Sequence, residues 1–186
     1  MICVPTLPRP TRKDRTGLFD YVSPTRLNTW LSCPLKFKIR YVDGLKEPTS
    51  PSLFVGKRVH SGLEFYYRCL QEGDTTTAID VEEQIVDTCD DAVASEGMYF
   101  DSHDEENALK QQTIRLVGTY LEQLDPAEGL PVAIESRLEC PLVDPDSGED
   151  LGIGLLGIVD LVLQSPTGAV IIDFKTSARA SAPLDV

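Results

Sequence analysis

The apolar positions in the first part of the chain recur with the spacing of an amphipathic helix. Ser23 and Pro24 form a typical helix start, because serine caps the first turn and proline fits the first helical position. Apolar side chains follow three and four residues apart until Pro34, which should bend or restart the helix. We therefore expect a helix from residue 23, a break at Pro34, and helical structure again over residues 35–42.

Three longer helices are predicted over residues 53–70, 79–98 and 104–124. A loop rich in proline and serine around residues 48–52 precedes the first of them. Val55, Val59 and Leu63 fall on one apolar stripe of that first helix, which should face the core. The other two helices carry acidic outer faces, which suit exposure to solvent.

Beyond residue 130 the apolar pattern changes to the period of a strand. Strands are predicted over residues 131–143, 151–164 and 169–175, with turn signals between them. Val132, Ile134 and Leu138 should share one face of the first strand. The sequence thus predicts an α+β fold in which helices come first and a β-meander follows. Residues 1–22 are expected to be irregular, and residues 23–186 to form one domain.

Charge is distributed unevenly along a chain whose formal net charge is −13. Residues 1–68 hold 12 Lys and Arg against 5 Asp and Glu, whereas residues 69–186 hold 5 against 25. A basic face on an acidic protein is therefore allowed, and such a face would make salt-dependent contacts with phosphates. Ordinary solvated surfaces explain the same distribution, so the charge pattern leaves both interpretations open.

The cysteines and the apolar runs bear on the compartment of the protein. The chain has 5 cysteines, widely spaced and without a C-x-x-C pair, which argues against a disulfide framework or a zinc site. Four of them are expected to be thiols in or near the core: Cys3, Cys69, Cys89 and Cys140. No apolar run reaches the ~20 residues of a membrane-spanning helix, and the N-terminal sequence lacks a secretory pattern. A cytoplasmic protein is the expectation.

The strongest candidates for chemistry are charged residues on two apolar strands. Asp160 follows Gly157-Ile158-Val159, and Asp173 and Lys175 end the next apolar run. A hairpin would bring the two carboxylates together, where a hard divalent cation would offset their desolvation and repulsion. Lys175 would share a strand face with Asp173 and could stabilise the charge of a phosphoryl transition state. An ordinary ion pair at a strand end is the alternative for Asp173 and Lys175 alone.

These residues resemble the RecB-like branch of the PD-(D/E)XK nuclease superfamily, in which a Gly-x-x-Asp strand precedes an Asp-x-Lys strand. Gly56 to His60 is similar to the helical G-x-x-x-H motif of that branch, whose histidine helps to bind metal. Residues 23–42, SPTRLNTWLSCPLKFKIRYV, resemble its N-terminal S-x-x-x-L-x-x-W/Y-x-x-C-P helix. The resemblance covers most of residues 20–177 and implies a restriction-endonuclease-like α+β fold.

The resemblance implies a metal-dependent DNA nuclease, expected to be an exonuclease of DNA repair or recombination. The implied metal ligands are His60, Asp160, Asp173 and the backbone carbonyl of Phe174. Lys175 would be the catalytic lysine and would act together with the two aspartates. Mg²⁺ or Mn²⁺ suits these oxygen and imidazole donors.

Further residues are expected to support this site. Glu135 could act through an outer-shell water, and Glu64 lies one turn after His60 on the same helix face. Exposed carboxylates with no such role are the alternative for both. The candidate DNA contacts are basic residues near the first two motifs: Arg26, Lys36, Lys57 and Arg58.

The end of the sequence departs from the family pattern. The family continues with a helix bearing a Gln-x-x-x-Tyr motif, whereas only eleven residues follow Lys175, and they contain neither Gln nor Tyr. The domain is therefore expected to lack a C-terminal helix and strand, as a truncated chain would. Some relatives hold an iron–sulfur cluster through one cysteine in the N-terminal helix and three after the nuclease motifs. Cys33 fits the first position, or is a packing residue, so a cluster is expected only in a longer form.

Three functions stay open from the sequence. A DNA nuclease, with DNA and a helicase or other recombination subunit as partners, is favoured by the intact metal and lysine positions. A catalytically inactive or truncated relative that binds DNA or acts as a scaffold is favoured by the absent C-terminal helix. A plain α+β binding domain with fortuitous motifs would leave Asp160 and Asp173 apart in space.

Overall fold

The structure is a computed structural model that describes residues 20–45, 47–96, 100, 102–125 and 129–176. The chain divides into two compact units. The larger unit comprises residues 46–138 and 158–186, and the smaller unit comprises residues 1–45 and 139–157. Strands β2 and β3 each contribute one part to either unit.

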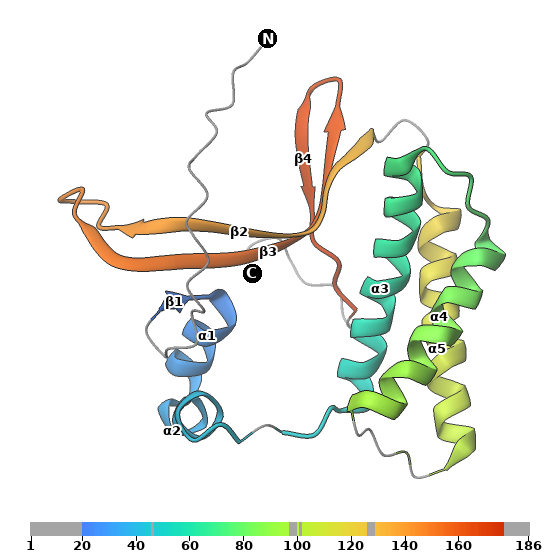
Figure 1. Ribbon diagram of the computed structural model, residues 1–186, viewed down its shortest axis with the longest axis horizontal. Helices are drawn as coiled ribbons and strands as arrows, with labels where there is room; N and C mark the ends of the chain where they lie inside the picture. Colours follow the sequence, from blue (N-terminus) through green and yellow to red (C-terminus); the bar gives the residue numbers. More distant parts are fainter. Residues whose placement is uncertain (1–19, 46, 97–99, 101, 126–128, 177–186) are drawn as a thin grey trace. The chain divides into compact units, whose positions relative to one another are not determined.

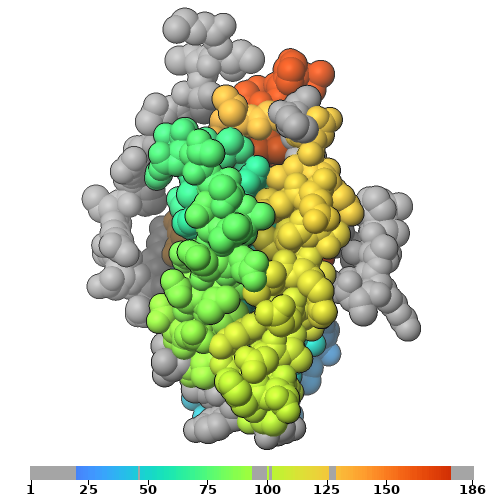
Figure 2. Space-filling view, turned by 90° about the vertical axis from the view of Figure 1, so that its right-hand side faces the viewer, coloured from blue at the N-terminus to red at the C-terminus, as the bar shows by residue number. Residues whose placement is uncertain are grey.

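Three long helices form most of the larger unit: α3 (Pro51–Glu72), α4 (Ala78–Glu96) and α5 (His103–Glu122). α4 and α5 lie side by side across one face of this unit (Figure 2), and α3 packs against both (Figure 1). α3 begins before the predicted residue 53, because the Ser50 hydroxyl accepts the Leu53 amide at 3.3 Å and Pro51 takes the first helical position. It ends at Gly73, whose φ of 81° is left-handed.

Most of the described acidic residues of α4 and α5 are exposed, as predicted, although Glu105 and Glu106 are partly buried. One lysine bridges the two helices. The Lys110 ammonium of α5 contacts Asp90 of α4 at 2.5 Å and Glu106 of its own helix at 2.7 Å. Hydrogen bonds to Asp90 and Glu106 raise the pKa of Lys110. This arrangement fixes the lateral packing of the two helices that support α3.

The main core of the larger unit lies between these three helices. The predicted stripe on α3 is buried, with Val55, Val59 and Leu63 at most 5% exposed. Side chains from all three helices complete the cluster: Phe54, Val81, Ile85, Cys89, Ala92 and Val117. Each fully buried aliphatic side chain of this kind contributes about 1.5–3 kcal/mol, so α3 is firmly held along the face next to its motif residues.

The strands of the sheet are β2 (Leu130–Val143), β3 (Asp150–Ser165) and β4 (Gly168–Ile172). β3 pairs antiparallel with β4, with Leu161 opposite Ile172 and Ser165 opposite Gly168. It also neighbours β2 in the sheet. A second buried cluster joins these strands to α3 through Tyr67, Ile134, Leu161 and Leu163.

Two details of the strands differ from the prediction. The last strand ends at Ile172, so residues 173–175 lie in an extended segment beyond it. Val132 and Leu138 are 52% and 55% exposed, whereas Ile134 is 6% exposed, so the three side chains are not buried together. Glu135 follows Ile134 and has a φ of 42°, which interrupts the regular alternation of sides between Ile134 and Leu138.

The smaller unit contains β1 (Tyr21–Val22), α1 (Pro24–Ser32), α2 (Pro34–Phe37) and the π-helix η1 (Lys38–Val42). The predicted start at Ser23 and break at Pro34 are confirmed, and extended backbone at Cys33 separates α1 from α2. Tyr21–Val22 fall in the segment expected to be irregular, yet they pair in parallel with Gly154 and Leu155 of β3. α1, α2 and η1 have no buried residue.

The predicted α+β class is confirmed, with β1 as a parallel addition to the expected meander. Within the described ranges, no helix combines the length and apolar content needed to cross a bilayer. Cys89 is buried and Cys69 half-buried, as expected. Cys140 is exposed, because it lies in the second half of β2, where most side chains are exposed. Cys3 lies outside the described residues.

Candidate metal centre

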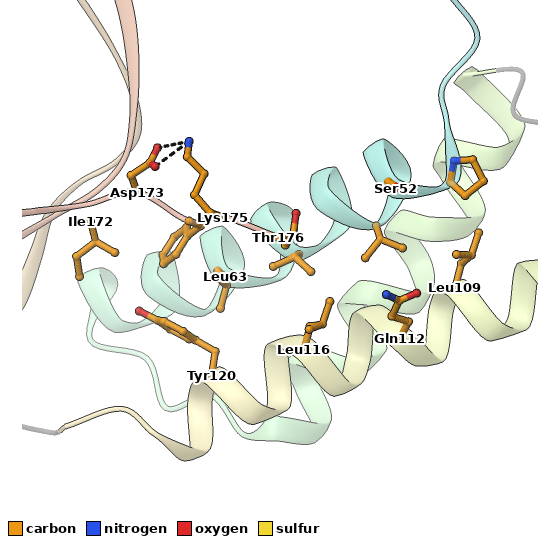
Figure 3. Close-up of a pocket in the computed structure, with 14 residues that line it drawn as sticks. Ser52, Leu63, Leu109, Gln112, Leu116, Tyr120, Ile172, Asp173, Lys175 and Thr176 are labelled. Carbon is orange, nitrogen blue, oxygen red and sulfur yellow. Dashed lines mark hydrogen bonds and ion pairs between the residues drawn. The ribbon is translucent and has the colours of Figure 1, made fainter. Parts of the chain in front are cut away.

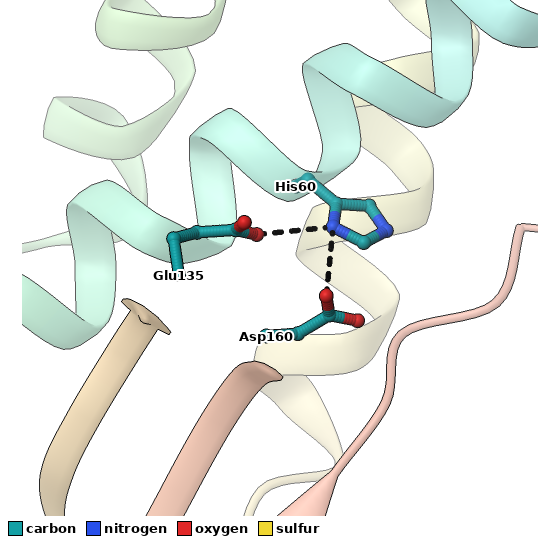
Figure 4. Close-up of side chains that lie close together, drawn as sticks. All are labelled: His60, Glu135 and Asp160. Atoms are coloured by element: carbon teal, nitrogen blue, oxygen red, sulfur yellow. Dashed lines mark hydrogen bonds and ion pairs between the residues drawn. The ribbon is translucent and has the colours of Figure 1, made fainter. Parts of the chain in front are cut away.

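One imidazole and two carboxylates converge in the larger unit from three different elements (Figure 4). His60 projects from α3, Glu135 from β2 and Asp160 from β3. His60 Nδ1 lies 3.1 Å from Glu135 Oε1 and 3.7 Å from Asp160 Oδ1. One ligand atom of each residue lies within 4.8 Å of the other two. This spacing is that of donor atoms able to share one ion.

The other nitrogen of His60 faces a backbone oxygen. His60 Nε2 lies 3.1 Å from the carbonyl oxygen of Phe174. Both ring nitrogens of His60 thus face oxygen atoms, with the two carboxylates at Nδ1 and the Phe174 carbonyl at Nε2. Nδ1 is therefore the nitrogen that a cation shared with the carboxylates would contact.

Asp160 connects β3 to the segment that follows β4. Its Oδ2 accepts the amide hydrogen of Phe174 at 2.7 Å, while its Oδ1 faces His60. Its side chain is only 11% exposed. The backbone of Phe174 therefore connects the two motif segments, because its N–H contacts Asp160 and its C=O lies next to His60.

Asp173 and Lys175 form an ion pair beside this group. Lys175 Nζ lies 2.7 Å from Asp173 Oδ2 and 2.9 Å from Oδ1. Both side chains are more than half exposed, at 57% for Lys175 and 54% for Asp173. The carboxylate of Asp173 is outside the convergent group of three, and Glu135 holds a place in it instead.

Aromatic rings fix the position of Phe174. Its ring stacks on Tyr67 at a centroid distance of 6.4 Å and meets Tyr120 edge-on at 5.4 Å. The hydroxyls of Tyr67 and Tyr120 are hydrogen-bonded at 2.8 Å, which ties α3 to α5 beneath the ring. His60 also meets Phe174 edge-on, at 5.8 Å. The backbone groups of Phe174 are therefore held by a partly buried side chain as well as by polar contacts.

Gly56 explains why the helix can approach the segment after β4. A Cβ at this position would lie 3.0 Å from Thr176 Oγ1, closer than ordinary contact. Gly56 precedes His60 by about one helical turn. The glycine of the G-x-x-x-H motif thus lets the strand end pass next to the histidine.

The backbone of Glu135 is in a conformation that non-glycine residues rarely adopt. Its φ of 42° belongs to the left-handed region, which costs of order 1–3 kcal/mol for such a residue. The bend turns the carboxylate toward His60, although the neighbouring Ile134 points into the core. The residue with the strained backbone is thus the same one whose carboxylate joins His60 and Asp160.

A hollow of about 810 Å³ adjoins the three convergent side chains and the Asp173–Lys175 pair. Lys57 and Arg58 also line it. Arg58 donates to the Thr88 carbonyl of α4 at 2.8 Å, whereas Lys57 is exposed. Two candidate DNA contacts from the sequence therefore border the same hollow as His60.

The remaining predicted residues are not members of the group of three. Glu64 pairs with Arg68 at 2.6 Å, although it also borders the hollow. Arg26, Lys36 and Cys33 belong to the smaller unit. The sulfur of Cys33 accepts the Lys36 amide at 3.4 Å and so caps α2.

An apolar groove of about 650 Å³ is lined by α3, by α5 and by the segment 172–176 at the end of β4 (Figure 3). Its walls are mostly aliphatic and aromatic: Val55, Val59, Leu63, Leu109, Leu116, Tyr120, Ile172 and Phe174. Asp173 and Lys175 lie at one end, where their ion pair is drawn. The segment 172–176 thus separates a polar hollow from an apolar groove.

The residues fit a hard divalent cation. The group offers two carboxylates and one imidazole, with the Phe174 carbonyl beside them, and such oxygen-rich sets suit Mg²⁺ or Mn²⁺. Glu135 and Asp160 crowd the same nitrogen of His60, which is costly for two carboxylates unless positive charge lies between them.

A family model for the PD-(D/E)XK nuclease superfamily matches residues 21–185. The chain belongs to this superfamily, and its α+β arrangement is consistent with the restriction-endonuclease-like fold. A search of curated proteins yields no match. Membership points to a nuclease that uses a divalent metal and acts on DNA.

The sequence predicted an outer-shell role for Glu135, and the structure places its carboxylate 3.1 Å from His60 Nδ1. The sequence did not connect Tyr67 and Tyr120 with the site. A carboxylate directly after the apolar run Val132-Ala133-Ile134 was an available signal for Glu135. No sequence signal indicated the contact of the two tyrosines beneath Phe174, because they come from helices that are far apart along the chain.

Proposed function

We propose that this protein is a metal-dependent DNA nuclease that hydrolyses phosphodiester bonds at the hollow beside His60. The observation that carries the proposal is the convergence of His60, Glu135 and Asp160 next to the Phe174 carbonyl and Lys175. Membership of the PD-(D/E)XK nuclease superfamily supports it.

The metal would be Mg²⁺ or Mn²⁺, held by His60 Nδ1, Asp160 and Glu135. The Phe174 carbonyl, which the sequence prediction counted among the ligands, faces Nε2 of the same ring and would orient His60. Asp173, the remaining ligand of the sequence prediction, would join the metal ligands by leaving Lys175. A bound divalent cation supplies Lewis acidity toward a phosphate oxygen. Asp160 would also hold the Phe174 amide, which keeps the carbonyl of the same residue directed at the group.

Lys175 would act on the phosphate itself. Its ammonium is exposed at the edge of the hollow, within reach of a bound backbone. By donating to a non-bridging phosphate oxygen, it would offset the charge that grows in the transition state. Lys57, which lines the same hollow, would contact neighbouring phosphates.

The finer assignment comes from the sequence resemblance to the RecB-like branch. On that basis we propose an exonuclease of repair or recombination, with a helicase or related subunit as partner in the cytoplasm. Linear DNA should then be degraded from its ends while a closed circle of the same sequence persists.

The direct test is cleavage of end-labelled single- and double-stranded DNA with Mg²⁺, Mn²⁺ or EDTA. Wild type is compared with Asp160→Asn, Lys175→Ala and Arg68→Ala. Arg68 pairs with Glu64 on the same helix as His60 and serves as the matched control. Metal-dependent cleavage lost in the first two variants and kept in the third supports the site. Equal cleavage by all three would exclude it.

A further inference from the structure

The helices of the smaller unit carry large apolar side chains that none of the unit's described residues buries. Trp30 is 51% exposed, and Leu31 and Leu35 are 70% and 65% exposed. None of the residues of α1, α2 and η1 is buried. An exposed patch of this kind in a folded protein indicates a binding surface.

The rings of this patch are arranged with cationic side chains. Trp30 meets Phe37 edge-on at 5.4 Å, and Phe37 lies 4.9 Å from Tyr41. Two guanidinium groups lie over the tyrosines, Arg26 at 3.8 Å from the Tyr21 centroid and Arg40 at 5.5 Å from that of Tyr41. We call these six residues the aromatic–arginine face: Tyr21, Arg26, Trp30, Phe37, Arg40 and Tyr41.

The helical segment that carries this face is basic, although the chain as a whole carries −13 and residues 139–157 of the same unit add five carboxylates and no cation. Residues 21–42 contain Arg26, Lys36, Lys38 and Arg40 and no Asp or Glu. Lys38 pairs with Asp43 just beyond η1, at 2.9 Å. An excess of cations within this helical segment, next to the exposed Trp30 and the half-buried Phe37 and Tyr41, favours a ligand that is both anionic and aromatic.

We infer that the aromatic–arginine face binds single-stranded DNA by stacking its bases on the rings and guanidinium planes. Stacking platforms combined with positive charge are the usual means of holding single strands without sequence preference. A duplex offers few free base faces, so single strands are the preferred form. The inference rests on the proposed nuclease function for its choice of DNA, and it narrows the substrate to strands with unpaired bases.

Trp30 gives this inference a direct reporter, because it is the only tryptophan in the chain. The intact protein is titrated with oligothymidylate in EDTA, where no metal-dependent cleavage occurs, and tryptophan fluorescence is recorded. Stacking should quench the emission, and added salt should weaken binding as phosphate contacts are lost. Iodide should quench the free protein strongly and the complex weakly. Trp30 shielded from iodide in the free protein would contradict the inference, because another surface would then cover the face.

Variants separate stacking from simple charge attraction. Tyr41→Ala should weaken binding roughly 5- to 100-fold, the range of one base–aromatic stack. Arg40→Ala should also weaken it, whereas Lys38→Ala removes the same charge from the same helix but from a side chain paired with Asp43. Equal losses in the two charge variants would favour nonspecific attraction and overturn the inference. Circular dichroism confirms that each variant remains folded, and Tyr41→Phe should restore binding.

The ligand is tested by competition with a duplex and an oligoribonucleotide of matched sequence. Quenching that is strongest with single-stranded DNA supports the inference, and quenching as strong with duplex or with RNA contradicts it. Quenching without Mg²⁺-dependent cleavage by wild type would refute the nuclease proposal alone. Cleavage of single strands without quenching would refute the stacking face alone.

Discussion

The helices of the two units carry comparable apolar patterns, yet they differ in what covers them. In α3 the side chains of Phe54, Val55, Val59 and Leu63 are at most 5% exposed, packed against α4 and α5. In α1, Leu27 and Leu31 recur at the same helical spacing and are 46% and 70% exposed. A hydrophobic stripe therefore shows that a helix has a face to cover, but not whether the same unit covers it.

The means of holding these helices differ accordingly. α3 is stabilised by burial, so its motif residues stand on a rigid support. α1, α2 and η1 rely on local devices, namely the caps at Ser23 and Cys33 and the contacts among Trp30, Phe37 and Tyr41. The packed region offers precise positions for chemistry, whereas the open region offers surface for a ligand.

The largest effect should come from Asp160→Asn in the packed region. Asparagine can still accept the Phe174 amide, but it loses the charge that a divalent cation needs. Cleavage should fall about a thousandfold or more, since the metal contributes several kcal/mol to the transition state. Quenched-reaction assays measure the rate, and thermal unfolding with and without Mn²⁺ measures binding.

The same variant sharpens the contrast between the units. Replacing the Asp160 carboxylate by a neutral amide lessens the repulsion with Glu135, so the metal-free melting temperature should not fall, while the rise caused by Mn²⁺ should disappear. Quenching of Trp30 by oligothymidylate in EDTA should persist. Loss of both metal response and quenching would show that the two regions do not act separately.

Core and surface truncations compare the two helices directly. Leu63→Ala should lower the free energy of unfolding by about 2–5 kcal/mol, because it opens a cavity among packed side chains. Leu31→Ala in α1 should change it by no more than about 0.5 kcal/mol. Urea unfolding measures both values. A cost for Leu31→Ala as large as that of Leu63→Ala would show that the face of α1 is covered.

A change at Glu135 tests whether strain accompanies function. Glu135→Gly and Glu135→Ala both remove the carboxylate and should weaken Mn²⁺ binding alike. Glycine tolerates a φ of 42°, so the glycine variant should be the more stable by about 1 kcal/mol. Isothermal titration and urea unfolding give the two quantities. A more stable alanine variant would indicate ordinary strand geometry at this position.

The smallest effect should come from Tyr120→Phe. It removes the hydroxyl contact with Tyr67 and should cost about 1 kcal/mol of stability. Metal affinity should fall by roughly tenfold or less, because the Phe174 carbonyl becomes less fixed. This is the lower end of the affinity loss that is usual when an outer-shell partner of a metal ligand is removed. In a cycle with Tyr67→Phe the losses should not add. Additive losses would mean that the two hydroxyls act independently.

The sequence alone determined the local features of this protein. The helix start at Ser23 follows from side-chain capping, and the break at Pro34 follows from the missing proline amide. Both effects act within a few residues. The order of helices and strands followed from the period of the apolar positions. The motifs around His60, Asp160 and Lys175 were readable because each is a short pattern of fixed spacing.

Only the tertiary structure decided which side chains meet. Glu135 rather than Asp173 lies in the group with His60 and Asp160, because a left-handed residue turns β2 and because β4 ends before Asp173. The tyrosines under Phe174 and the passage of Thr176 beside Gly56 also depend on packing between distant segments. Such contacts are fixed by how whole elements pack and not by local spacing, so the sequence predicted the chemistry available but not its arrangement.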